Sequence, residues 1–269
     1  INIMINIIYA VGLNLILGVA GQFSLGHAGF IAIGSYSGAI LGKMINGLPG
    51  LFAGMAVGVV ISVIVAFLVG LPTLRLKGDY LAIATLGVAE IIRVAVTNMK
   101  ITNGAAGISG VPLTNTWTIT YIALVLTTIL ILNYTFSSAG RATYAVLQDE
   151  IAAESMGVQV TKYKILAFVL GAATASIGGT LSATTLGAVT PSDFTFMKSI
   201  DVLIIVVFGG IGSFTGSFVA AVLLGIINLV LQPFGQLRMI IYAVALILIM
   251  IFRPGGLLGT WEFKLGDFK

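Results

Sequence analysis

The stretch LFAGMAVGVVISVIVAFLVGLP at 51–72 decides the fold class. It contains no charged side chain, and a helix needs about 20 mostly apolar residues to cross the hydrocarbon core of a bilayer. Because hydrocarbon offers no water to the backbone, such a segment must satisfy its peptide groups internally, as a helix does. The stretch therefore predicts a transmembrane helix.

The composition extends this prediction to the whole chain. Of 269 residues, 58% are apolar and 34 are glycine, and only 8% are charged, whereas a soluble domain carries about a quarter charged residues. The apolar content excludes intrinsic disorder, and the lack of cysteine excludes a disulfide-framework secreted fold. The basic residues that give the net charge of +4 are scattered singly, so we expect no nucleic-acid partner.

Further apolar runs lie on both sides of this stretch. We expect an all-α, polytopic transmembrane helical bundle of about nine spans, within a range of about eight to ten. The runs 25–42, 79–97 and 193–208 are short or interrupted by polar residues, so any of them is a candidate for a broken or re-entrant segment. Continuous apolar runs without a period of two exclude a β-barrel. The nine runs are 1–19, 25–42, 51–72, 79–97, 117–135, 163–187, 193–208, 217–231 and 237–252.

Lysine and arginine in the connections orient the bundle, because cytoplasmic connections carry an excess of them. With the polar stretch 136–162 in the cytoplasm, residue 1 lies outside and the C-terminus inside. Because Ile1 is not an initiator methionine, we expect that a helix can precede it, and 1–20 lacks the basic start of a signal peptide. The inside set is Arg75, Lys77, Arg141, Lys162, Lys164, Arg253, Lys264 and Lys269, and the outside set is Lys43, Lys100, Lys198 and Arg238.

Glycines recur at intervals of four residues. Small residues at this spacing let helix backbones approach closely in lipid, so close packing within the bundle is the main expectation. The alternative is a hinge or an unwound helix beside a transport path. The repeats are Gly34, Gly38 and Gly42, Gly54 with Gly58, and Gly212 with Gly216.

Signatures of soluble enzymes are absent from the sequence. A single histidine, His27, cannot build a metal cluster or a catalytic triad, and no G-x-x-x-x-G-K-[ST] run is present to bind ATP. We therefore expect no catalytic, metal-binding or cofactor-binding residues and a chain that is not an enzyme. His27, beside Ser24 and Gly26 at the expected cytoplasmic start of its run, is more typical of a packing or capping residue than of a proton relay.

The polar stretch AGRATYAVLQDEIAAESMGVQVTKYK at 139–164 predicts a short helix. Two acids favour its start through the helix dipole, two alanines form its middle, and one glycine can supply the left-handed residue that ends it. Such a helix is either a solvated loop helix or a docking helix that fits a groove on a soluble subunit. The five residues are Asp149, Glu150, Ala152, Ala153 and Gly157.

Four of these residues resemble a known pattern. Glu150, Ala152, Ala153 and Gly157 resemble the E-x-A-A-x-x-x-G core of the loop by which ABC importer permeases engage their ATPases. Five further stretches, in order and spacing, resemble the permeases for branched-chain amino acids, and the M-type subunit more than the H-type. They are VAGQFSLGHAGFIAIGSYSGA (19–39), RLKGDYLAIATLGVAEIIR (75–93), NGAAGISGVP (103–112), VFGGIGSFTGSFVAA (207–221) and FRPGGLLG (252–259).

The resemblance implies one transmembrane permease domain over 1–269, with the ABC importer permease fold and a cytoplasmic ATPase-docking loop at about 137–163. It implies a multi-pass protein of the bacterial or archaeal cytoplasmic (inner) membrane, surrounded by lipid. The implied partners are an H-type permease, two cytoplasmic ATPase subunits and an extracytoplasmic binding protein that delivers the amino acid. ATP binding would close the ATPase pair, and the docking helices would transmit that motion to a path that opens alternately to each side.

Ionisable groups within spans are costly and are functional candidates. Glu90 and Arg93 stand three residues apart, so they share a helix face and can neutralise one another. Ion pairing, with Arg93 near the outer end of its span, is the main expectation, and contact with the substrate's carboxylate or amino group is the alternative. Asp201 is expected either to pair with Lys198 one turn away or to serve a cavity.

A branched aliphatic substrate needs an apolar cavity with few convergent polar groups. We expect the glycine- and serine-rich backbone of 21–38, together with 207–217, to line it, because exposed backbone groups there can meet a zwitterion. The candidate path residues are Gly21, Ser24, His27, Gly34, Glu90, Arg93, Gly209 and Gly212.

Three alternative functions stay open at this point. The first is a permease of the same family for urea or short-chain amides. The second is an ion-coupled secondary transporter or a channel acting alone, for which only Glu90 or Asp201 can supply a coupling carboxylate. The third is a membrane scaffold without transport activity, which fits the composition but leaves the docking loop and the glycine repeats unexplained.

Overall fold

A computed structural model describes residues 1–74, 76, 78–230, 244, 247, 255–257 and 259. Helices form most of this part and the strands are two residues long, which confirms the all-α class. The elements are α1 (Asn2–Asn14), η1 (Leu15–Val19), α2 (His27–Met44), α3 (Leu48–Thr73), α4 (Asp79–Asn98), η2 (Gly104–Ala106), β1 (Ile108–Ser109), α5 (Trp117–Phe136), α6 (Ser138–Gln148), α7 (Glu150–Ser155), α8 (Val160–Leu186), β2 (Ala188–Val189), η3 (Pro191–Phe194), α9 (Phe196–Gly209) and α10 (Phe214–Val230).

Five helices in the described part are long and apolar enough to cross a membrane, or six if the bent pair α9 and α10 counts as one span. The five are α1 continued by η1, α3, α4, α5 and α8. The sequence-based figure was about nine. It also counted α2, whose His27, Lys43 and serines lower its hydropathy, and α9 and α10 separately. It further counted the run 237–252, which lies almost entirely outside the described residues.

The pair α9 and α10 forms a hairpin with a bend of 118°. It follows β2 and η3, at the end of α8 that is distant from α7. Its second helix returns toward the N-terminus, because Gly225 packs against the side chain of Ile3. The run 193–208 therefore belongs to a sharply bent helix pair, the geometry of a broken or re-entrant segment that its short length suggested.

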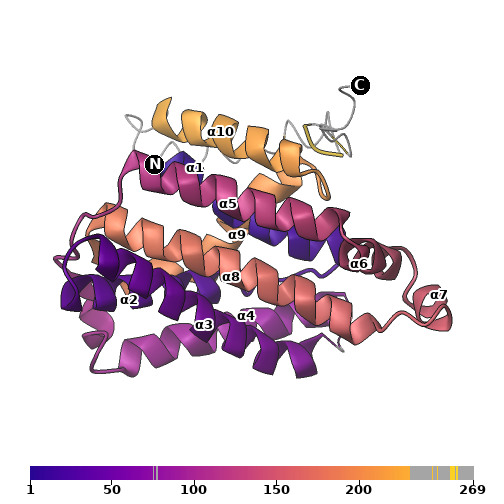
Figure 1. The fold of residues 1–269 in the computed structure, drawn as a ribbon, viewed down its shortest axis with the longest axis horizontal. Coiled ribbons are helices and arrows are strands. Elements are labelled where there is room, and N and C mark those ends of the chain that lie inside the picture. Colours follow the sequence, from indigo (N-terminus) through magenta and orange to yellow (C-terminus); the bar gives the residue numbers. More distant parts are fainter. Residues whose placement is uncertain are drawn as a thin grey trace.

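The long helix α8 forms the centre of the bundle (Figure 1). It packs against α1, α2 and α3. The N-terminus lies at one end of the bundle, and α6 and α7 lie at the opposite end, where α7 projects beyond the other helices. This arrangement agrees with the predicted orientation, which places residue 1 and the stretch 136–162 on opposite sides. Among the residues used for that orientation, Arg75, Lys77, Arg238, Arg253, Lys264 and Lys269 lie outside the described part.

Close packing explains two of the three glycines in the α2 repeat. A Cβ atom on Gly34 would overlap the carbonyl oxygen of Ser176 in α8, and one on Gly38 would lie 2.7 Å from Cγ2 of Thr180. A Cβ atom on Gly42 would meet nothing closer than 3.8 Å. The repeat thus lets α2 and α8 approach closely along part of its length, as expected for small residues in lipid.

Two short strands tie the connection between α4 and α5 to the end of α8. They pair antiparallel, with Ile108 opposite Val189 and Ser109 opposite Ala188. This pairing lies at the end of α8 that is distant from α7, so it covers the bundle on the side of the N-terminus.

Candidate docking helix and translocation path

The predicted docking helix forms as α7, Glu150–Ser155. Asp149 caps its start, because the carboxylate accepts hydrogen bonds from the backbone N–H groups of Ile151 and Ala152 at 2.8 and 3.1 Å. Gly157 follows its end with a φ of +83°, a left-handed conformation that glycine adopts without strain. The local roles expected of Asp149 and Gly157 are therefore confirmed.

Helix α7 and the residue that caps its end expose two large apolar side chains. Ile151 is 76% exposed and Met156 is 84% exposed, whereas Ala153 is buried. The helix lies beyond the end of the bundle (Figure 1). Large apolar side chains on a projecting helix are typical of a surface that another protein covers.

An ion pair joins α7 to the central helix. Glu150 at the start of α7 pairs with Lys164 in the first turns of α8. The same lysine's backbone carbonyl accepts a hydrogen bond from the side-chain amide of Gln22 at 3.0 Å. Because α8 packs on α1, α2 and α3, these contacts provide a continuous physical connection from α7 to the bundle.

A second helix, α6, precedes α7 and was not predicted from the sequence. Ser137 caps its start by accepting a hydrogen bond from the N–H of Gly140 at 3.2 Å. The hydroxyls of Tyr134 and Thr143 lie 2.6 Å apart and fix it to the end of α5. Ser137 was the available signal, because serine is a favoured cap residue. The polar composition of 136–162 instead indicated a connection with one short helix, so a second helix starting at Ser137 was not expected.

The chain unwinds within the bundle after η1. Residues 21–26 have no regular structure, and the N–H of Leu25 donates a hydrogen bond to the hydroxyl of Thr85 at 3.0 Å. Since Thr85 is six residues after the start of α4, this contact lies about 9 Å along that helix. Helix α2 therefore begins inside the bundle. His27 is the first residue of this helix and is 1% exposed, consistent with a packing residue at the start of its run; its place on the cytoplasmic side stays a prediction.

Three predicted path residues lie along this unwound segment. Gly21 has a φ of +66°, and the hydroxyl of Ser24 accepts a hydrogen bond from the N–H of Gly26 at 3.3 Å. The ring of His27 lies beside the backbone of Tyr9, and neither ring nitrogen makes a hydrogen bond of acceptable geometry to a described residue. Their role in a path stays a prediction.

A second break separates α9 from α10, and Asn14 holds it. The Asn14 amide donates to the carbonyl of Ser213 at 2.8 Å and to the hydroxyl of Ser217 at 3.0 Å. Its side-chain oxygen accepts from the N–H of Gly212 at 2.9 Å. Asn14 is fully buried, so this network fixes the turn against the end of α1.

The two breaks meet at η1. A Cβ atom on Gly18 in η1 would overlap the backbone of Gly212, and Gly209 packs against the backbone of Gly216. Non-helical backbone at membrane depth occurs where protein covers it or where it lines a cavity. The structure thus places η1, which leads into the segment 21–38, against the turn within 207–217, while Gly34 lies in the seam with α8. That these segments line a path stays a prediction.

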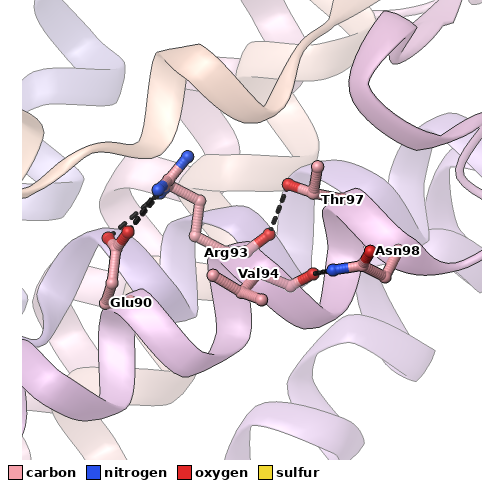
Figure 2. A network of polar contacts seen from close by, with 5 residues as sticks. All are labelled: Glu90, Arg93, Val94, Thr97 and Asn98. Atoms are coloured by element: carbon pink, nitrogen blue, oxygen red, sulfur yellow. Dashed lines mark hydrogen bonds and ion pairs between the residues drawn. The ribbon is translucent and has the colours of Figure 1, made fainter.

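Glu90 and Arg93 form the ion pair that their spacing predicts (Figure 2). The Nε atom of Arg93 lies 3.0 Å from both carboxylate oxygens of Glu90. The expected pair of Lys198 with Asp201 is not formed, because no carboxylate oxygen of the described residues lies within 4.0 Å of the Lys198 ammonium. That ammonium instead lies 5.6 Å from the centre of the Tyr9 ring.

Comparison with known proteins agrees with the resemblance found in the sequence. Residues 1–252 match the family model described as branched-chain amino acid transport system / permease component. The high-affinity branched-chain amino acid transport system permease protein LivM of Salmonella typhimurium is 37% identical over 95% of this chain and 68% of its own length. LivM of Escherichia coli is 36% identical over the same shares.

The permease protein LivH of Salmonella typhimurium is 24% identical over 95% of this chain and 91% of its own length. The higher identity to LivM supports the M-type resemblance. No solved structure matches the chain. The chain belongs to the family of branched-chain amino acid transport permease components.

Proposed function

We propose that this chain is the M-type permease subunit of an ATP-binding-cassette importer for branched-chain amino acids. Helix α7 is the observation that carries the proposal, because it projects from the bundle and exposes Ile151 and Met156. The proposed partners are an H-type permease, two cytoplasmic ATPase subunits and an external binding protein. We place the complex in the cytoplasmic membrane of a bacterium or archaeon, with 1–269 as one non-catalytic permease domain and about 137–163 as its docking loop.

In this mechanism the ATPase moves α7, and α8 carries that motion into the membrane. The ion pair of Glu150 with Lys164 connects the two helices. Close packing at Gly34 makes α2 and α8 move together, because packed interfaces do not deform continuously. The breaks at 21–26 and 210–213 are then the places where the backbone can change direction. Alternate access results from a shift between two such arrangements.

An ion-coupled transporter fits the geometry less well. It needs a carboxylate that is available to the coupling ion near the middle of the membrane. Glu90 is already paired with Arg93 (Figure 2), which leaves Asp201 as the carboxylate that such coupling would have to use. The importer proposal predicts instead that uptake by the complex requires ATP.

The test is ATP-driven leucine uptake by the complex reconstituted in vesicles with its permease partner, both ATPases and the binding protein. Ile151→Glu in α7 and Met156→Glu at its C-cap each replace an exposed apolar side chain by a charge, so neither variant disturbs a buried contact. We expect loss of ATPase association and of uptake. Leu113→Glu is the matched control, because Leu113 is 70% exposed and lies beside Gly187, which ends α8 at the end distant from α7. Full uptake by both α7 variants would contradict the docking role.

A further inference from the structure

A cavity of about 250 Å³ lies between α1, α2, α8 and the segment formed by η3 and α9. It reaches from Tyr9, near the middle of the span formed by α1 and η1, to Asp193 in η3. It therefore opens toward the end of the bundle where the N-terminus lies, which the orientation places outside. Its volume is below the range of about 300–1,000 Å³ that holds drug-sized ligands, so it suits a smaller molecule.

Two side chains of opposite charge line this cavity, Lys198 and Asp193. They do not form an ion pair with each other, since none within 4.0 Å involves either residue in the described part of the chain. The Oδ2 atom of Asp193 accepts hydrogen bonds from the N–H and the hydroxyl of Thr190 at 3.0 and 2.7 Å. These contacts fix the carboxylate and leave its Oδ1 atom available to a ligand.

The uncharged part of the cavity wall combines two hydroxyl groups with apolar side chains. The Tyr9 hydroxyl is buried beside Ser182 and makes no hydrogen bond of acceptable geometry to a described residue. The Ser35 hydroxyl donates to the carbonyl of Gly179 at 2.9 Å, so its lone pairs stay available. Between these polar groups the wall is apolar, and its aliphatic members are Ile31, Leu186 and Val189.

We propose that this cavity binds the substrate as a zwitterion, with the α-carboxylate at Lys198 and the α-ammonium at Asp193. The branched side chain then lies against Ile31, Leu186 and Val189. The Lys198 ammonium is partly buried, and a partly buried charge is costly unless it is paired. Asp193 is exposed at the other end of the cavity, and an α-amino acid brings a partner for both charges at once. A simple carboxylic acid or amine brings a partner for only one. This assignment rests on the proposed function and adds the residues that bind the charged groups of the substrate.

The test measures binding of radiolabelled leucine to the complete transporter in lipid nanodiscs, without the binding protein. The competitors are 4-methylpentanoate, which lacks the amino group, and 3-methylbutylamine, which lacks the carboxylate. For the unaltered transporter we expect leucine to compete about tenfold or more better than either, because each analogue loses one charge-assisted hydrogen bond.

Substitution of each charged residue should change the competition by the two analogues in a different way. Lys198→Gln should remove the preference for leucine over the amine and keep the preference over the acid. Asp193→Asn should do the reverse, and Lys198→Arg should retain the unaltered pattern. The matched control Lys100→Gln changes an exposed residue outside the cavity and should leave both preferences unchanged.

Leucine uptake by the unaltered transporter in vesicles separates the two proposals. If the unaltered transporter imports leucine but Lys198→Gln and Asp193→Asn show unchanged competition, the cavity assignment alone is overturned. Binding with the expected competition pattern, but without ATP-driven uptake, supports the cavity and overturns the proposed function. An assembled transporter that neither binds nor imports leucine overturns both.

Discussion

The seam between α2 and α8 and the turn between α9 and α10 use glycine in opposite ways. In the seam, Gly34 and Gly38 are helical, and their missing side chains let another backbone approach. At the turn, Gly210 and Gly212 have φ values of +116° and +89°, where a side chain is strained whatever space surrounds it. The seam therefore joins two helices into one unit, whereas the turn interrupts a helix. Glycines four residues apart occur in both regions, so this spacing in the sequence does not distinguish the two roles.

The largest expected effect tests the seam. Gly34→Ala places a Cβ atom against the carbonyl oxygen of Ser176, so the helices must separate. We expect a loss of about 3 kcal/mol in stability, measured by thermal unfolding of the purified complex in detergent. Gly42→Ala is the control, with no neighbour closer than 3.8 Å, and should be neutral or stabilising by up to about 1 kcal/mol. Equal losses for the two variants would contradict the contact explanation.

The next effect tests what holds the turn. Asn14→Leu removes the hydrogen bonds to Gly212, Ser213 and Ser217 and leaves buried polar groups without partners. We expect about 2 kcal/mol of destabilisation. Hydrogen exchange should become faster at 210–213 than in the seam. Uniform acceleration over the whole bundle would show that Asn14 does not act specifically on the turn.

A smaller effect separates backbone strain from contact. Gly212→Ala should cost about 1–2 kcal/mol because of its positive φ, although a Cβ atom there would meet nothing closer than 3.5 Å. Gly212→Asn should cost less, since asparagine tolerates left-handed backbone better. Thermal unfolding of both variants decides the question. A larger cost for asparagine would indicate a steric cause, as in the seam.

The smallest effect on stability tests whether the seam moves with α7. Glu150→Gln breaks a partly exposed ion pair with Lys164, and we expect about 1 kcal/mol or less. The amount of leucine imported per ATP hydrolysed should nevertheless fall. The double variant Glu150→Lys with Lys164→Glu should restore part of this ratio. An unchanged ratio in Glu150→Gln would exclude the pair from the coupling route.

Features set by neighbours in sequence were predictable. The caps of α7 and the pair of Glu90 with Arg93 depend on residues one turn apart. The burial of His27 among other helices was not predictable, because it depends on where the unwound chain crosses α4. The cavity was missed for a similar reason. Lys198 was expected to pair within its own helix, but packing places its ammonium over Tyr9 from α1.

The central claim is that α7 contacts the ATPase, and cross-linking tests it most directly. The sequence contains no cysteine, so Met156→Cys places one reactive thiol on α7, and Leu113→Cys places one at the opposite end. With a short thiol–amine cross-linker, the account predicts a product with the ATPase from Met156→Cys and none from Leu113→Cys. A transporter that imports leucine but forms no ATPase product from Met156→Cys, or equal products from both variants, would contradict it.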